Sequence, residues 1–157
     1  MEKSLEMKFK DVLFNFEQLN LFSTLLEQEP LHKEVMFFIV QQFLNASDNA
    51  NSKANIKSIT ENIQVERKVG VKKKGSSLKF DNKIEYISRK MAESIVKQLG
   101  FASLIYTESV GQFKYIGPTS RGVLVYKFLD KKDKYRNNEI SKEEYEEYLR
   151  KIKTQKF

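Results

Sequence analysis

Clustered cations are the residues best suited to chemistry in this chain. Lysine and arginine number 28 against 21 aspartates and glutamates, a formal net charge of +7, and nine cationic but only three acidic residues fall between 64 and 90. With no cysteine and one histidine, His32, thiol catalysis, disulfides, thiolate metal sites and histidine-based acid/base sites are hard to build. We expect His32 to be a surface or capping residue. The cations favour contact with a polyanion or with an acidic protein surface.

A predicted helix that begins near residue 88 presents part of this charge on one face. Its apolar stripe at helical spacing consists of Ile87, Met91, Ile95 and Leu99, with Ala92 and Val96 beside them. Its opposite face carries Arg89, Lys90, Glu93, Ser94, Lys97 and Gln98. Ser88 is suited to cap the helix. Residues 104–107 and 113–116 then suit two strands joined by a turn at Val110-Gly111, and Gly117-Pro118 ends the second strand.

This order of helix, strand, turn and strand resembles the end of a winged helix-turn-helix domain. Residues 87–106, ISRKMAESIVKQLGFASLIY, are similar to the family's recognition helix and its exit. Ser103 stands where the family usually has Gly, and Gly100 comes early, so we expect the helix to stop one turn sooner than in the family. Residues 115–122, YIGPTSRG, resemble the point where the second wing strand gives way to a capped helix.

The resemblance implies an α+β, mostly helical fold with a winged-helix core and helical extensions at both ends. The expected parts are an N-terminal extension at 1–30, the winged-helix domain at 31–130, and a connector with an amphipathic helix at 131–157. Residues 31–44 are uniformly apolar and should form the central core helix, and 55–64 resemble the first helix of the helix-turn-helix pair. The basic insertion at 65–86 departs from the family. We expect it to form a short hairpin or to order only with a partner.

Both ends of the chain are predicted to be helical. Residues 5–28 have apolar side chains on more than one side, so they either wrap the chain's own core or form a homodimer contact. Residues 131–138 are predicted to be a charged connector. Ser141 and Glu144 then form a capping box that opens an amphipathic helix, and residues 139–152 also resemble the short C-terminal modules called SHOCT domains. The surface that this last helix covers, its own domain or another protein, stays open.

We expect a sequence-specific double-stranded DNA-binding protein, a cofactor-free homodimer that regulates transcription in the cytoplasm. Arginine can bind guanine in two places at once, and lysine positions a protein on phosphates. The wing would extend toward the backbone or minor groove through Gln112 and Lys114. The predicted DNA contacts are Arg67, Lys68, Lys72, Lys73, Lys74, Lys79, Ser88, Arg89, Lys90, Glu93, Ser94, Lys97, Gln112 and Lys114.

Three alternatives remain open on the sequence alone. One is a replication or partition accessory protein of a mobile element, and another is a winged-helix adaptor that binds proteins through its terminal helices. The third is a metal-dependent nuclease built on Glu66, Lys68 and Asp48. The chain shows no signal peptide and no apolar segment long enough to span a bilayer, so we expect a soluble protein without a membrane partner.

Overall fold

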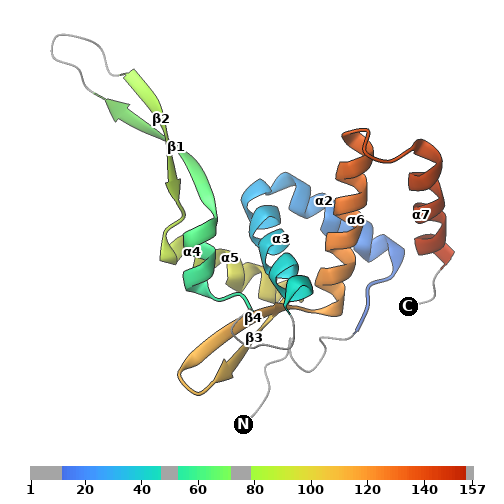
Figure 1. Ribbon diagram of the computed structural model, residues 1–157, viewed down its shortest axis with the longest axis horizontal. Coiled ribbons are helices and arrows are strands. Elements are labelled where there is room, and N and C mark those ends of the chain that lie inside the picture. The colour runs from blue at the N-terminus through green and yellow to red at the C-terminus, as the bar shows by residue number, and fades with distance from the viewer. Residues whose placement is uncertain (1–11, 47–52, 72–78, 155–157) are drawn as a thin grey trace.

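The structure is a computed structural model that describes residues 12–46, 53–71 and 79–154. It is an α+β fold of helices and two separate antiparallel hairpins (Figure 1). The helices are α2 (Phe16–Gln28), α3 (Pro30–Asn45), α4 (Ile56–Asn62), α5 (Arg89–Phe101), α6 (Ser120–Arg136) and α7 (Lys142–Thr154). The strands are β1 (Gln64–Val71), β2 (Lys79–Tyr86), β3 (Ile105–Val110) and β4 (Phe113–Pro118).

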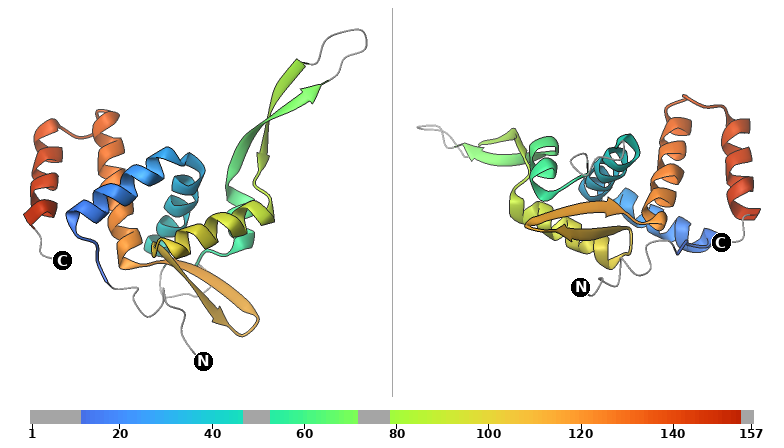
Figure 2. Two further views of the ribbon diagram at one scale, coloured as in Figure 1. Left: turned by 180° about the vertical axis from the view of Figure 1, so that it is seen from behind. Right: turned by 60° about the horizontal axis from the view of Figure 1, so that its bottom comes forward.

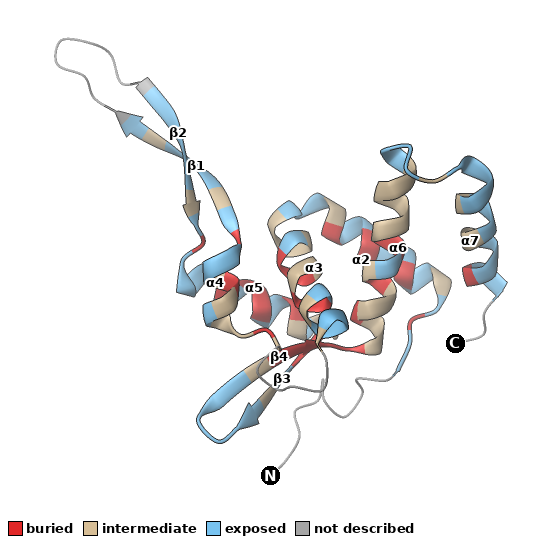
Figure 3. Cartoon of the chain, viewed as in Figure 1, coloured by how far each residue is buried: buried red, intermediate tan, exposed pale blue. Residues whose placement is uncertain are grey.

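Helix α3 is the centre of the core. Val35, Met36, Ile39 and Val40 are fully buried, and the helix packs against α2, α5, α6 and β4. Figure 3 shows the buried residues gathered where these elements meet, while the outer parts of both hairpins are exposed. The prediction of a central helix at 31–44 is confirmed, with Pro30 at its first turn, where a missing amide costs nothing.

Helix α2 begins after Asn15, whose side chain accepts a hydrogen bond from the Gln18 amide at 2.8 Å in a capping box. Of the helical span expected at 5–28, residues 5–11 lie outside the described residues, and residues 12–15 are not helical because the helix begins only after Asn15. Phe14, just before the helix, is buried and stacks on Phe22 with 4.7 Å between ring centroids. The helix therefore covers its own core through α3 and α6.

The charged connector predicted at 131–138 is wrong, because α6 continues through it to Arg136. Opposite charges one turn apart favour helix, as in the 3.1 Å pair of Lys134 with Asp130. Neighbouring helices supply further partners, and Asp133 lies 2.8 Å from Lys33 of α3. Paired charges thus stabilise the last turns of α6, which the polar sequence did not identify as helical.

The expected amphipathic helix near the C-terminus is present as α7, and its surface is α6 of the same chain. The Ser141 hydroxyl accepts a hydrogen bond from the Glu144 amide at 3.2 Å, one of the two bonds of the predicted capping box, while the Glu144 carboxylate lies 3.8 Å from Lys131. Tyr145 stacks on Tyr135 of α6, and Ile152 is buried. Burial also raises the pKa of Tyr148 to about 12.

The insertion between α4 and α5 forms a hairpin, one of the two expected outcomes. Strands β1 and β2 pair from Gln64↔Tyr86 to Val71↔Lys79. At the hairpin's base, Ile63 and Ile87 are both buried, and the Ile87 amide donates to the Ile63 carbonyl at 3.0 Å. The second hairpin pairs β3 with β4, and Ala54 adds an isolated bridge to Ile116.

Helix α5 does not stop early at Gly100, contrary to the sequence expectation, but continues to Phe101. Ser103 adopts the left-handed conformation, with φ of 60°, which lets the Leu104 amide bond to the Leu99 carbonyl at 3.0 Å. Burial of Leu99 and Leu104 outweighs the modest helix penalty of Gly100. The chain thus makes the usual turn with a serine in the place of glycine.

Among the described residues, no helix combines the length and apolar character that crossing a membrane requires.

Ser103→Gly should raise the free energy of unfolding by about 0.5–1 kcal/mol, because glycine removes the left-handed strain at some cost in unfolded-state entropy. Urea denaturation measures the change. Gly111→Ser is the matched control, because Gly111 has φ of 62° and an added β-carbon would meet nothing within 4 Å. This variant should lose a similar amount of unfolding free energy. A stability loss in Ser103→Gly would contradict the assigned backbone conformation.

Glu27 fastens α2 to α6. Its carboxylate accepts a 2.6 Å hydrogen bond from Lys132 Nζ and lies 2.8 Å from Arg136 Nη1. Burial acts to raise the pKa of Glu27, but the hydrogen bonds and charges of Lys132 and Arg136 outweigh it, so the pKa is lowered. The stabilisation is therefore fully present above the unfolded-state pKa of about 4.3 and is lost as the pH falls through the folded-state value.

Glu27→Gln should lower the free energy of unfolding by about 1–2 kcal/mol at pH 7. The deficit relative to the parent protein should shrink as the pH falls toward 3, because the parent carboxylate is then protonated. Urea denaturation at the two pH values provides the test. Glu61→Gln is the control: its exposed pair with Lys57 spans 3.9 Å and should contribute less than about 0.5 kcal/mol. An equal loss of unfolding free energy at pH 7 and pH 3 would argue against stabilisation by the charged contacts of Glu27 with Lys132 and Arg136.

Candidate functional site

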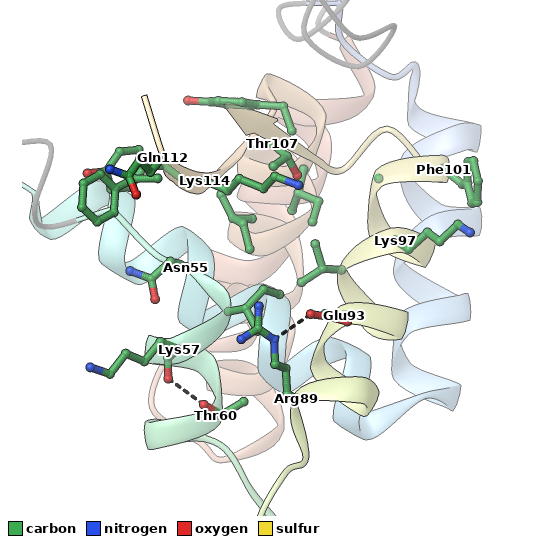
Figure 4. Close-up of a pocket in the computed structure, with 18 residues that line it drawn as sticks. Asn55, Lys57, Thr60, Arg89, Glu93, Lys97, Phe101, Thr107, Gln112 and Lys114 are labelled. Atoms are coloured by element: carbon green, nitrogen blue, oxygen red, sulfur yellow. Dashed lines mark hydrogen bonds and ion pairs between the residues drawn. The ribbon is translucent and has the colours of Figure 1, made fainter. Parts of the chain in front are cut away.

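A groove of about 940 Å³ lies between α4, α5 and the β3–β4 hairpin (Figure 4). Its lining holds four cationic side chains and one carboxylate. They are Lys57 from α4, Arg89, Glu93 and Lys97 from α5, and Lys114 from β4. A surface with this balance attracts anions, and it brings together cations that are up to 57 residues apart in the sequence.

Helix α5 presents its polar face beside this groove. The Ser88 hydroxyl caps the helix by accepting a hydrogen bond from the Met91 amide at 3.1 Å. The buried face consists of Ala92, Ile95, Val96 and Leu99. Met91, which the sequence placed in the apolar stripe, is exposed because it falls at the edge of this buried arc. The polar face is exposed to solvent and can therefore contact a partner.

Arg89 and Glu93 form an ion pair on that face, with Arg89 Nε 2.9 Å from Glu93 Oε1. Both side chains are exposed, so water screens the pair and it contributes little to stability. The guanidinium can therefore exchange this partner for another anion. Figure 4 shows the pair at the α5 wall of the groove.

The structure gathers only part of the predicted contact set. Arg89, Glu93, Lys97, Gln112 and Lys114 line the groove, and Ser88 caps the helix beneath it. Lys90 and Ser94 are exposed on α5 without lining the groove. The remaining predicted residues lie on the β1–β2 hairpin or outside the described residues: Arg67, Lys68 and Lys79 are in its strands, and Lys72, Lys73 and Lys74 are not described.

The strands of the β1–β2 hairpin are nearly neutral. They hold four cationic and three acidic residues, and Arg67 lies 3.4 Å from Glu85 across the pair. Most of the positive excess at 64–90 therefore comes from residues 72–74 and from the start of α5. The two strands themselves therefore add only one net positive charge.

Both hairpins project from the end of the molecule that holds α4 and α5 (Figures 1 and 2). Helices α2, α6 and α7 lie at the opposite end.

Several groove residues were missed by sequence reasoning. Lys57 and Thr60 come from α4, which was predicted as the first helix of the helix-turn-helix pair without any contact residue, and Phe101 and Phe113 are apolar residues that a binary pattern assigns to the core. Phe113 had one available signal, because it directly follows the turn of a hairpin, where side chains are commonly exposed.

His32 is half-buried and does not cap α3, which has no side-chain cap, so the expected capping role is not found. Its Nε2 forms a hydrogen bond with Oε1 of Gln98, which ties the start of α3 to α5. The histidine thus helps to hold α5 against α3.

The residues of the nuclease alternative are only partly described. Glu66 and Lys68 are exposed on β1, and Asp48 lies outside the described residues. Within residues 12–46, 53–71 and 79–154, no group of three or more His, Cys, Asp or Glu side chains is placed to hold a metal ion.

Comparisons with protein-family models, with curated proteins and with solved structures found no match. Function must therefore be inferred from the residues and geometry of this chain.

Proposed function

We propose that this chain is a winged helix-turn-helix protein that binds double-stranded DNA. The order α3, Ala54 bridge, α4, α5 and β3–β4 hairpin supports this fold, since three helices and a wing follow each other as in the domain it resembles. Helix α4 packs directly on α5 although the β1–β2 hairpin separates them in sequence. The insertion therefore leaves the helix pair in contact.

The observation that carries the proposal is the position of the polar face of α5. It is exposed, it borders a groove with four cations and one carboxylate, and two hairpins project in different directions from the end of the molecule that holds α5. An α-helix fits the major groove of DNA, while a projecting hairpin can reach the backbone or the minor groove. Charge and shape thus favour the same elongated polyanion.

The proposed roles follow from side-chain chemistry. Arg89 exchanges Glu93 for a guanine edge or a phosphate, and Lys90, Ser94 and Lys97 contact neighbouring base edges or phosphates. Gln112 and Lys114 hold the backbone beside the wing. The cations of the β1–β2 hairpin, including Lys72, Lys73 and Lys74 by sequence, contact phosphates farther along the duplex.

Transcriptional regulation in the cytoplasm without a cofactor is the use that we propose, by analogy with the domain that the chain resembles. Replication or partition of a mobile element would use the same contacts. An adaptor role is the main competitor, because an acidic protein surface would also be attracted to clustered cations.

Replacing both Arg89 and Lys90 by Glu should abolish duplex binding, because the reversal places two negative charges where the proposal places DNA. Fluorescence anisotropy with a mixed-sequence duplex measures binding, and circular dichroism checks the fold, which should persist because both side chains are exposed. Replacing Lys142 and Lys151 by Glu on α7 is the matched control, because it makes the same charge change at the opposite end of the molecule and should weaken binding far less. Unchanged affinity in the Arg89/Lys90 variant would reject the assignment of α5.

The salt dependence of the same titration tests the hairpin. Replacing Lys72, Lys73 and Lys74 by Ala should make the slope of log affinity against log salt shallower by about two to three units, because fewer counterions are released. An identical slope would remove this segment from the interface. Absence of duplex binding even at low salt would favour the adaptor.

We also propose that the chain is a homodimer through α2. Leu21 and Leu25 lie one turn apart on its outer face and are 56% and 48% exposed. Large apolar side chains on one exposed helix stripe favour contact with another surface, and a second copy supplies a self-complementary one. Two-fold symmetry would match a palindromic or repeated DNA site.

Replacing Leu21 and Leu25 by Glu should convert the dimer to a monomer without unfolding it, because both side chains face away from the core. Size-exclusion chromatography with light scattering measures the mass. Parent protein that is monomeric at micromolar concentration would exclude the dimer, and a dimeric variant would move the contact to another surface.

A further inference from the structure

Two exposed aromatic rings line the groove beside α5. Phe101, the last residue of α5, is 75% exposed, and Phe113, the first residue of β4, is 66% exposed. Neither ring contributes to the buried core. Rings of this size left in water at a single groove are suited to contact a ligand with flat apolar faces.

A cation lies over one of the two rings. Lys97 Nζ lies 5.8 Å from the centroid of the Phe101 ring. Phe113 precedes Lys114, and its ring lies against Tyr115 with 6.4 Å between centroids and 28° between ring planes. In Figure 4, Lys114 extends from the hairpin into the groove, whereas Phe101 and Lys97 point away from the hairpin on the outer side of α5. A partner seated in the groove therefore meets Phe113 and Lys114 on the hairpin, and Phe101 and Lys97 at the outer edge of the groove.

The tip of the β3–β4 hairpin also carries exposed apolar side chains, next to Gln112. Val110 pairs with Phe113 across the turn, and a β-carbon added at Gly111 would meet only open space. These apolar side chains can press against the end of a base stack, while Gln112 can reach the backbone.

Paired bases in a duplex stack on each other, so an aromatic side chain reaches a base face only where a nucleotide is unpaired or flipped out. Aromatic platforms within a cationic groove are the chemistry by which proteins hold single-stranded nucleic acid. Among the charged residues lining the groove, the single carboxylate, Glu93, is already paired with Arg89. This balance argues for a polyanion rather than for a purely apolar protein partner.

We infer that the groove binds unpaired nucleotides next to the duplex, so that the preferred ligand is a junction of double- and single-stranded DNA. Phe113 and Phe101 stack on the unpaired bases, and Lys97 and Lys114 hold the adjoining phosphates. This inference rests on the proposed duplex binding by α5 and adds a second class of contact to it.

The test compares a blunt duplex with the same duplex carrying a single-stranded extension of about eight nucleotides, with 2-aminopurine in the extension. The parent protein should bind the extended duplex about tenfold more tightly, because one stacked base contributes a factor of that order. Stacking on a ring should also change the 2-aminopurine fluorescence. Anisotropy and fluorescence are read in the same titration.

Phe113→Ala and Phe101→Ala should reduce the ratio of the two affinities toward one and diminish the 2-aminopurine response. Phe113→Tyr should retain both, because it keeps a stacking ring. Phe80→Ala is the matched control, since Phe80 is 64% exposed on the other hairpin and does not line the groove. Its affinity ratio should equal that of the parent.

Equal affinity of the parent protein for both DNAs, or an unchanged ratio and fluorescence response in both alanine variants, would overturn the inference and leave the duplex proposal standing. Failure to bind either DNA at low salt would overturn the duplex proposal and the inference together.

Discussion

The buried hydroxyl of Thr119 joins three elements on which the groove depends. It donates to the Ser103 carbonyl at 2.6 Å and accepts from the Gly122 amide at 3.1 Å, while the Thr119 amide bonds to the Leu104 carbonyl at 3.0 Å. The end of α5, the end of β4 and the start of α6 are thereby held at one point. Gly122 is required there, because a β-carbon at this position would lie 2.0 Å from the Leu104 oxygen.

This junction sets the position of the β3–β4 hairpin relative to α5, and hence the width of the groove between them. The Ala54 bridge supports the hairpin from its other side through the 2.8 Å bond of the Ile116 amide. From the core side, α3 packs against both α5 and β4. Charged groups fasten the outer helices at a distance from the groove, through Glu27 and Asp133.

The β1–β2 hairpin is inserted between α4 and α5 without separating these two helices in space. Its two ends, at Ile63 and Ile87, are bonded to each other, so sixteen strand residues leave and re-enter the fold at one place. Helices α4 and α5 consequently keep their contact. The proposed DNA interface combines a helix face, a nearby hairpin and this longer arm, each supported independently by the core.

The sequence by itself determined the elements whose signals are local. Periodicity and caps predicted α3, α4, α5, α6 from Thr119 and α7, because a helix stripe and an N-cap depend on neighbours within a few residues. It did not predict that residues 131–136 are helical, because this depends on ion pairs with α3 such as that of Asp133 with Lys33. It also did not predict that α5 continues past Gly100, because the burial of Leu104 outweighs the low helix preference of glycine. Only the tertiary structure decided which predicted cations share a groove and that Phe101 and Phe113 face solvent. Exposure depends on what distant segments cover, and the sequence held a local signal for it only at Phe113, which directly follows a hairpin turn.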